Sequence, residues 1–373
     1  MKRLLGSLVI ICLVLAIGVI LIIYAQGKRL GKDGKLVGIG ILQVGTVPNN
    51  ASIYLNGQFK SKSDTNIEDL KPGNYTVKIQ KDHYHTWEGL VKIKEGFVTP
   101  LTVTLFPVNP SLTALTSDGV FAPRLSSDNK QIAFGLQTGN QTGVWVLSLG
   151  NNQFFFGSSN ESHRVVADAP NYLFSKASLE WSPDNKSILA TVEKVGTTET
   201  KVFLLDSSQT DGKAQDVTAS IQTLRQDWIK QRQQQVDSKI KNFSNDIVAA
   251  AKQAKSVTFS KDENSVLIIN SNQTAIVQDL KPSPVPNTKP ETYTLPAATN
   301  YFWYQGDSKH LIAVDGNIIS VLDSNGTNKF SLFTGDFDPN AVFSWPDGSK
   351  LIISINLNSK SNPLPNLYTI SLI

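Results

Sequence analysis

The fold of this chain is decided by the stretch Ser178-Leu-Glu-Trp-Ser-Pro-Asp-Asn-Lys-Ser-Ile-Leu-Ala-Thr-Val192, because variants of it recur along the sequence. A short apolar run ends at Trp181 and leads into Ser182, Pro183, Asp184 and Asn185. Proline fixes φ for a type I turn, aspartate bonds back to the turn backbone, and asparagine tolerates the left-handed position. An apolar, partly β-branched run follows. The stretch therefore predicts a tight β-hairpin.

The same pattern occurs five times, and an aspartate marks the turn of every copy. These turn aspartates are Asp128, Asp184, Asp262, Asp307 and Asp347, and the last copy keeps the proline as Pro346. Neighbouring aspartates are 56, 78, 45 and 40 residues apart. The two shortest intervals match the four-stranded blade of a β-propeller. The interval of 78 residues predicts an insertion between the second and third copies.

Each hairpin is followed by further runs that are typical of strands, but the last copy has one run fewer than the others. We predict that residues 111–115 supply its fourth strand from the other end of the repeat region. Such a latch closes the ring and removes free sheet edges, which invite aggregation. The count predicts five blades, with six as the nearest alternative.

The repeats resemble the TolB-type propeller repeat, whose core reads Trp-Ser-Pro-Asp-Gly-Lys. The copy from Trp181 to Lys186 matches all of it except the glycine, which is Asn185 here. The copy that begins at Leu125 matches this core less well, and the copy from Trp303 to Asp307 carries an extra residue. The resemblance implies a rigid disc whose loops bind protein or glycan.

The N-terminus predicts a membrane anchor. An uncharged run of 21 residues extends from Leu4 to Tyr24, and as a helix it would be about 30 Å long, enough to cross a bilayer. We expect residues 1–26 to be an uncleaved anchor and residues 27–39 a tether. The positive-inside count alone places the C-terminal side in the cytoplasm. We nevertheless expect the domains to lie outside a bacterial cytoplasmic membrane, since signal anchors commonly keep a short N-terminus inside.

Residues 40–107 resemble a PEGA domain, a small β-sandwich found on bacterial envelope proteins. The motif residues are Pro48, Asn49, Asn50 and Ala51 for Pro-Glu-Gly-Ala, Leu70, Pro72, Gly73 and Tyr75 for Leu-x-Pro-Gly-x-Tyr, and Tyr84 of the Gly-Tyr pair. The middle of the first motif is replaced, although asparagine also suits a tight turn. The resemblance implies spacing or adhesion and no catalytic residues.

The long interval contains a helical pattern. Apolar residues recur at three- and four-residue steps across residues 219–254, with a polar lapse at 232–235. This pattern predicts one amphipathic helix, or two that join near the lapse. It could lie against the propeller, or it could mediate docking or self-association.

Catalytic and metal sites are not predicted. The main enzymatic alternative is a propeller glycosidase or other carbohydrate-active enzyme acting at the channel mouth, which needs a pair of carboxylates. We expect Glu180 to be the one acid on the innermost strands and to pair with Arg124. Four acids before these strands could form a polar rim, namely Asp118, Asp168, Asp336 and Asp338.

Histidines and turn aspartates also have plainer explanations than metal binding. His83 and His85 form a His-x-His pair, but a zinc site needs three or four converging ligands. The turn aspartates could suggest a ring of calcium sites, yet each has a local role in its turn. We predict no cofactor and no metal.

Composition limits the remaining function classes. The chain has 373 residues with 35 basic and 31 acidic side chains, and this balance gives no electrostatic reason to expect nucleic acid. Its single cysteine, Cys12, excludes an intrachain disulfide.

The sequence as a whole predicts an all-β protein behind a transmembrane helix. A PEGA-type β-sandwich at 40–107 precedes a β-propeller at 111–373, which carries the helical insertion at 219–254. The expected role is non-catalytic binding or scaffolding in the cell envelope, with an envelope protein or a glycan as partner.

Overall fold

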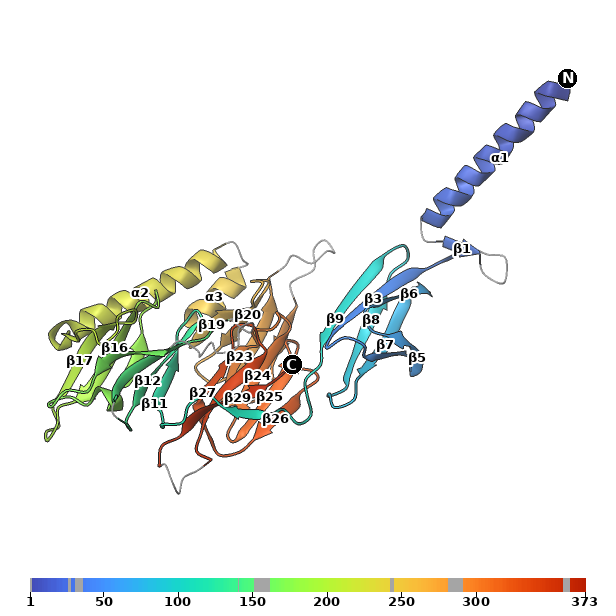
Figure 1. The fold of residues 1–373 in the computed structure, drawn as a ribbon. Coiled ribbons are helices and arrows are strands. Elements are labelled where there is room, and N and C mark those ends of the chain that lie inside the picture. The colour runs from blue at the N-terminus through green and yellow to red at the C-terminus, as the bar shows by residue number, and fades with distance from the viewer. Residues whose placement is uncertain are drawn as a thin grey trace. The chain divides into compact units, whose positions relative to one another are not determined.

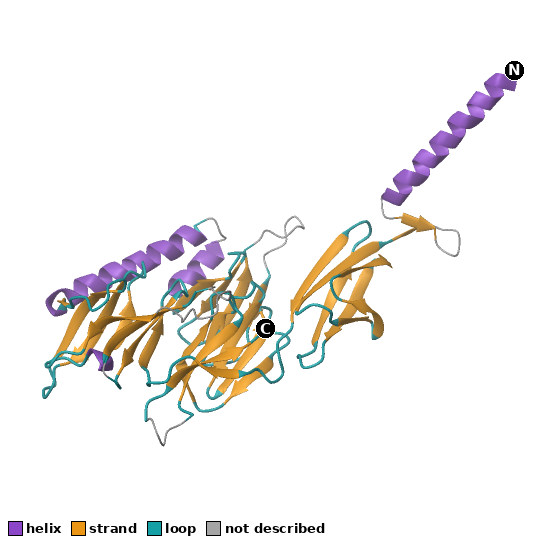
Figure 2. Cartoon of the chain, viewed as in Figure 1, coloured by secondary structure: helices purple, strands orange, loops and turns teal. Residues whose placement is uncertain are grey.

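The computed structural model describes residues 2–25, 28–30, 36–139, 141–150, 162–241, 245–280, 291–357 and 363–373. The chain divides into two compact units, Met1–Val108 together with Ile373, and Asn109–Leu372. Strands are the main kind of secondary structure in both units (Figure 2). Each unit is described by itself.

The first element is helix α1, Lys2–Ala25 (Figure 1). Its large apolar side chains between residues 10 and 22 are 48% to 65% exposed. The predicted ends of the membrane span, Leu4 and Tyr24, lie on α1, but their side chains are outside the described part. Among the described residues, no helix combines the length and the hydropathy that membrane crossing requires. The predicted anchor therefore stays a prediction.

The segment predicted as a tether contains a small sheet. Strands β1, Lys28–Leu30, and β2, Leu36–Gly38, pair antiparallel. The expectation that residues 27–39 form a tether stays a prediction.

The rest of the first unit is two sheets around one core. The three-stranded sheet has the order β6-β3-β9 and the four-stranded sheet β5-β4-β7-β8. Their bounds are β3 Gly40–Val47, β4 Ser52–Leu55, β5 Gln58–Lys62, β6 Thr65–Leu70, β7 Gly73–Gln80, β8 Trp87–Ile93 and β9 Val98–Thr104. Leu42 and Val103 from one sheet meet Ile53 and Ile79 from the other. The two sheets therefore form the predicted sandwich.

The second unit contains five antiparallel sheets of four strands each among the described residues. The first is β11 Phe121–Leu125, β12 Gln131–Leu136, β13 Gly143–Ser148 and β14 Ser162–Ala167. The second is β15 Ser178–Trp181, β16 Ser187–Glu193, β17 Thr200–Asp206 and β18 Gln215–Asp216. The third is β19 Ser256–Phe259, β20 Ser265–Ile269, β21 Ala275–Asp279 and β22 Thr292–Thr294.

The fourth sheet is β23 Asn300–Trp303, β24 His310–Asp315, β25 Ile318–Asp323 and β26 Phe330–Thr334. The fifth combines β27 Phe337–Ser344, β28 Lys350–Ile355 and β29 Asn366–Ser371 with β10 Leu112–Ala114. Within it, Leu112 pairs with Ile370 and Ala114 with Tyr368. The predicted latch between the two ends of the repeat region is thus confirmed.

Three pairs of neighbouring sheets share apolar cores. Val144 of the first sheet packs with Leu179 of the second, and Val277 of the third packs with Tyr301 of the fourth. The fifth sheet returns to the first, where Ile352 packs in one cluster with Ile132. Inner strands also lie close together at three places, β11 with β15, β11 with β27 and β19 with β23.

Two helices fill the place between the second and third sheets (Figure 1). Helix α2, Ile221–Ile240, places Trp228 against Leu189 and Val202 of the second sheet. Helix α3, Asn245–Gln253, places Ile247 against Val266 and Ile268 of the third sheet. The predicted insertion is therefore helical and lies against the sheets on both sides.

The polar residues 232–235, near which we predicted a break between two helices, do not end α2. Helix α2 continues through residues 232–235 and ends only at Ile240. Arg232 donates to the carbonyl oxygen of Trp181 at 2.8 Å, and Gln235 donates to that of Pro183 at 3.4 Å. The lapse is polar because these side chains bind the hairpin of the second sheet, and it is not a helix end.

Candidate functional site

A cavity of about 540 Å³ opens between the inner strands of the second unit. Residues of β11, β19, β23 and β27 contribute to its wall, and the C-terminal half of α2 forms another part of it. Its aromatic lining residues are Phe259, Phe302, Trp303 and Phe343, and its carboxamides are Asn129, Gln235, Asn300, Gln305 and Asn340. The cavity is the candidate site.

Strand alternation positions these side chains. In β23, Tyr301 and Trp303 are buried and pack in the core shared with the third sheet. Successive side chains of a strand point to opposite faces, so Asn300 and Phe302 point away from that core, and both line the cavity.

In two copies the repeated tryptophan fixes its hairpin to the preceding sheet. The indole of Trp303 donates to the carbonyl oxygen of Thr258 at 3.2 Å. In the second copy, Trp181 donates to the carbonyl oxygen of Arg124 at 2.9 Å. The repeat motif therefore holds the inner strands together and shapes the cavity wall.

The turn aspartates of the first three copies bind their own hairpins. Ser182 donates its hydroxyl to Asp184 at 2.6 Å, and the backbone N–H of Lys186 donates to the same oxygen at 3.2 Å. Asp128 and Asp262 have the equivalent serine and backbone contacts. The hydrogen bond from Ser182 is the main reason that the pKa of Asp184 is lowered.

Asp262 is held most strongly in its charged form. Burial alone would raise its pKa, but hydrogen bonds from Asn264 and Ser260 outweigh this effect and lower the pKa to about 2. Among the described residues, no cluster of three or more histidine, cysteine, aspartate or glutamate side chains could hold a metal. The turn aspartates and the pair His83 and His85 therefore give no reason to propose a metal site.

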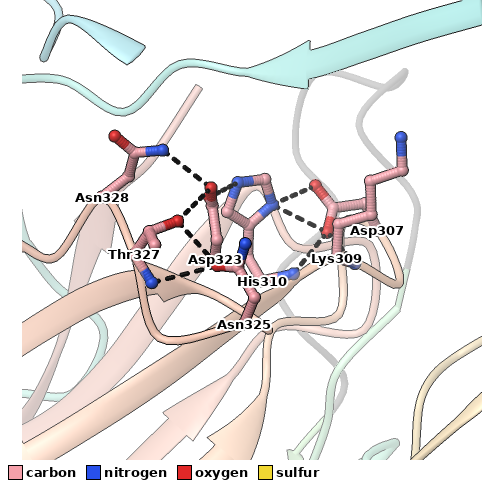
Figure 3. A network of polar contacts seen from close by, with 7 residues as sticks. All are labelled: Asp307, Lys309, His310, Asp323, Asn325, Thr327 and Asn328. Carbon is pink, nitrogen blue, oxygen red and sulfur yellow. Dashed lines mark hydrogen bonds and ion pairs between the residues drawn. The ribbon is translucent and has the colours of Figure 1, made fainter. Parts of the chain in front are cut away.

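In the fourth copy a histidine side chain binds the turn aspartate, whereas in the first three copies a serine hydroxyl does so. His310 is 5% exposed and lies between two carboxylates (Figure 3). Its Nδ1 is 2.7 Å from Asp307, and its Nε2 is 3.2 Å from Asp323. Burial alone would lower the pKa of His310, but the two aspartates outweigh it and raise the pKa to about 9. The imidazole is therefore protonated at neutral pH.

Sequence reasoning did not find this cluster. The available signal was the extra residue between Trp303 and Asp307, which lengthens the turn and replaces its serine by Tyr304. Asp323 in turn accepts hydrogen bonds from Thr327 and Asn328 (Figure 3). The cluster fixes the hairpin that carries Gln305 into the cavity.

The fifth hairpin, with Pro346 and Asp347, packs against the fourth. Asp347 accepts the backbone N–H of Ser349 at 2.8 Å. Gly348 has a φ of 77°, and a Cβ there would lie 2.1 Å from the nitrogen of Gly306. Only glycine satisfies both the conformation and the close approach.

The predicted ion pair between Glu180 and Arg124 is wrong. Glu180 pairs with Arg225 at 3.5 Å and with Arg232 at 3.4 Å, both on α2. Arg124 donates to the carbonyl oxygen of Pro123. The reason is that α2 covers the face of the second sheet on which Glu180 lies, and this packing cannot be predicted from the local pattern of residues.

The acids expected at the rim do not gather into one site. Asp168 accepts two hydrogen bonds from Ser175, both of 2.7 Å, and Asp118 accepts one from Ser117. Asp336 is exposed between β26 and β27. Asp338 lies on inner strand β27 and accepts the N–H of Asn340. Glu180 is therefore not the one acid on the inner strands, because a register irregularity lets β27 begin at Phe337.

The two charged lining residues of the cavity bind each other. Lys239 of α2 forms an ion pair with Glu263 at 2.6 Å. The Lys239 ammonium also lies 5.0 Å from the centre of the Phe259 ring. Within the described lining, the remaining side chains are uncharged. The cavity wall is thus close to neutral.

The PEGA motif residues shape turns of the first unit. Pro48, Asn49 and Asn50 carry the chain from β3 to β4, in the other sheet, and Asn50 has a φ of 64°. Ala51 and Leu70 are buried in the core, and Tyr84 packs against it. Pro72 directly precedes β7, and Gly73 and Tyr75 lie within it. The hydroxyl of Tyr75 donates to the carbonyl oxygen of Lys71.

Comparison with protein families agrees with the resemblance to a PEGA domain. Residues 39–109 match the PEGA domain family. Comparison with curated proteins finds no matching sequence. Among solved structures, TolB from Acinetobacter baumannii is 12% identical, with 83% of this chain and 59% of that chain covered and a TM-score of 0.19.

Two further solved structures are similar at low identity. The Swd1 β-propeller domain of Myceliophteria thermophila is 9% identical, with 72% of this chain and 100% of the Swd1 chain covered and a TM-score of 0.32. An oligogalacturonate lyase from Vibrio parahaemolyticus is 7% identical, with 80% of this chain and 86% of the lyase covered and a TM-score of 0.27. The chain thus contains a PEGA domain, and TolB and other β-propellers are among the structures similar to it.

Proposed function

We propose that this chain is a membrane-anchored cell-envelope protein that binds or scaffolds and does not catalyse. In this proposal the second unit is a five-bladed β-propeller in which α2 and α3 fill the place of a sixth blade. The PEGA domain separates the propeller from the anchor. The partner is an envelope protein or a glycan.

The ring arrangement is supported by pairing and packing. The latch between β10 and β29 joins the ends of the repeat region. Shared cores join the first sheet to the second, the third to the fourth, and the fifth to the first. The helices bridge the second and third sheets. A closed ring of this kind leaves a rigid central cavity for binding.

One observation carries the non-catalytic role: Glu263 is the one carboxylate in the described lining of the cavity, and Lys239 holds it in an ion pair. The other candidate acids also have partners, since Glu180 is held by two arginines, Asp168 by Ser175 and Asp338 by Asn340. Glycoside hydrolysis instead needs two carboxyl groups facing each other across the substrate, about 5 to 9.5 Å apart. Binding needs no such pair, and it suits a neutral, rigid cavity.

The membrane location rests on the N-terminal sequence and on α1. The run from Leu4 to Tyr24 contains no charged residue, and the apolar side chains of residues 10–22 are exposed along the helix. Exposed apolar side chains over such a length favour a lipid environment. We place the propeller and the PEGA domain outside the cytoplasmic membrane, because signal anchors commonly keep a short N-terminus inside. A protease-protection assay on spheroplasts would contradict this placement if both domains were shielded.

Self-association through residues 219–254 is a weaker part of the proposal. The apolar residues Leu224 and Trp228 of α2 already pack on the second sheet. Ile229 is the one large apolar side chain of α2 that is mostly exposed. Sedimentation of the full chain with Ile229→Lys would reveal a changed oligomeric state if α2 mediated association.

The test of the binding role is crosslinking in intact cells. A photo-crosslinking residue at Gln305 or Asn129 reports on the cavity, and one at the exposed Gln226 of α2 is the matched control. We expect a defined adduct from the two cavity positions and none from Gln226. The proposal is wrong if the purified chain cleaves a glycan and Glu180→Gln, Asp168→Asn and Asp338→Asn together abolish that cleavage.

A further inference from the structure

We infer that the central cavity is a binding site for an uncharged carbohydrate, a mono- or short oligosaccharide or the end of a neutral glycan chain. This inference rests on the proposed binding role and names its ligand class. The site is made by the inner strands β11, β19, β23 and β27 together with α2.

Charge is the first argument. Lys239 and Glu263 are the charged members of the described lining, and they neutralise each other at 2.6 Å. A charged ligand entering the cavity would lose hydration without gaining an opposite charge. The wall therefore selects against acidic sugars, phosphates and charged peptide side chains.

Hydrogen-bonding capacity is the second argument. Asn300 and Asn340 are exposed at the cavity on neighbouring inner strands, and Asn129 and Gln305 lie on the hairpins nearby. A carboxamide both donates and accepts hydrogen bonds. Gln305 and Asn340 each use one N–H within the chain, on the carbonyl oxygen of Trp303 and on Asp338, so a second N–H and the amide oxygen of each can serve a ligand. Each hydroxyl of a sugar does the same, so the two groups match without a fixed order of donors and acceptors. A peptide backbone instead presents donors and acceptors in fixed alternation, which matching strand edges bind better.

An apolar surface beside these amides is the third argument. Phe302 is half-buried and lies on the same face of β23 as Asn300. Val342 of β27 lines the same cavity next to Asn340. Sugar rings have one C–H-rich face and an edge of hydroxyls, so an aromatic ring flanked by carboxamides contacts both. A volume of about 540 Å³ lies within the usual 300–1,000 Å³ of small-molecule sites.

The experiment is calorimetric titration of the full chain in a zwitterionic detergent, since a detergent with a sugar headgroup would compete. The probes are cello-, malto- and chito-oligosaccharides, with tri-galacturonate as the acidic comparison and a neutral, unstructured peptide as a second one. We expect saturable binding of at least one neutral oligosaccharide. Tri-galacturonate and the peptide should bind at least about tenfold more weakly, a difference of about 1.4 kcal/mol.

Matched variants locate the binding. Phe302→Ala, Asn340→Ala and Gln235→Ala should each weaken binding about tenfold. Phe59→Ala in the first unit and Gln226→Ala on the outer side of α2 should leave it unchanged, because neither residue lines the cavity. Circular dichroism checks folding. If Phe302→Ala does not fold, Phe302→Leu keeps an apolar side chain and removes the ring face.

Each outcome decides the inference. It is overturned if no neutral oligosaccharide binds, if tri-galacturonate or the peptide binds better, or if the cavity and control variants bind equally. A bound oligosaccharide that is cleaved would overturn the non-catalytic role and leave the ligand class standing. A protein adduct from Gln305 without glycan binding would overturn the ligand class and leave the binding role standing.

Discussion

Two junctions of the second unit solve the same packing problem in different ways. Between the third and fourth sheets, sheet packs directly on sheet, and Trp303 donates across the junction to Thr258. Between the second and third sheets, α2 and α3 intervene. There the position of the repeat tryptophan is taken by Phe259, which contacts Lys239 of α2 and makes no indole hydrogen bond.

The difference concerns which groups hold the ring together. At the direct junction, the indole of Trp303, the side chain of Lys261 and the backbone N–H of Asp262 all reach the neighbouring hairpin. At the helical junction, Arg232 and Lys239 of α2 make the connections through long charged side chains. Exposed ion pairs contribute little and weaken with salt. The helical junction should therefore be the less stable place in the ring.

The largest effect should come from the two buried tryptophans, one at each junction. Trp303→Ala removes a core side chain and a hydrogen bond, and should lower the free energy of unfolding by about 4–5 kcal/mol. Trp228→Ala opens a similar cavity under α2 without that bond and should cost about 3–4 kcal/mol. Urea unfolding followed by circular dichroism measures both.

A control for this pair is Ile229→Ala, next to Trp228 on α2 but 56% exposed, which should change stability by less than about 0.5 kcal/mol. If Trp228→Ala costs more than Trp303→Ala, the ranking of the two junctions is wrong.

The next effect concerns pH and the fourth hairpin, which contacts both of its neighbours. The pKa of His310 is raised from its ordinary 6.5 to about 9 in the folded chain. Its stabilising contribution is therefore complete below about pH 6.5 and is lost as the pH rises through about 9. Between these values the unfolding free energy should fall by about 2–3 kcal/mol.

The measurement is the unfolding free energy from pH 6 to 10 for the wild type, His310→Gln and His163→Gln. His310→Gln should flatten the fall, and His163→Gln should keep it, since His163 binds the carbonyl oxygen of Ser207 in another sheet. An identical profile for His310→Gln and the wild type would contradict the role of the two aspartates.

How much of this could be read from sequence depends on how local the chemistry is. The turn aspartates and the latch were predictable, because a hairpin motif and a missing strand are features of the chain itself. The partners of Glu180 and the end of α2 were not, because both depend on which sheet face α2 covers. The polarity of Arg232 and Gln235 looked like a helix break for the same reason. The cavity-lining positions of Asn300 and Phe302 follow from strand alternation, but only once the cavity is known.

A third effect tests how closely the fourth and fifth hairpins, which also pack directly on each other, approach at Gly306 and Gly348. Gly348 and Gly196 have nearly equal φ values, 77° and 76°, but a Cβ on Gly348 would meet Gly306, whereas one on Gly196 would meet nothing within 4 Å. Gly196→Ala should cost about 1 kcal/mol for the backbone conformation alone. Gly348→Ala should cost about 2–3 kcal/mol, because the fourth and fifth hairpins must also separate. Equal costs in thermal unfolding would show that the hairpins yield easily.

The smallest effect isolates the charged contacts of the helical junction. Arg232→Met keeps most of the apolar stem and removes both the ion pair with Glu180 and the hydrogen bond to the carbonyl oxygen of Trp181. We expect a loss of about 1 kcal/mol at low salt that shrinks in 1 M NaCl, because salt screens exposed charges. Lys261→Met removes a hydrogen bond to the carbonyl oxygen of Gln305 at the direct junction and should show less salt dependence. Hydrogen exchange should then show faster opening of α2 amides in Arg232→Met alone, and equal opening in both variants would mean that charge does not distinguish the two junctions.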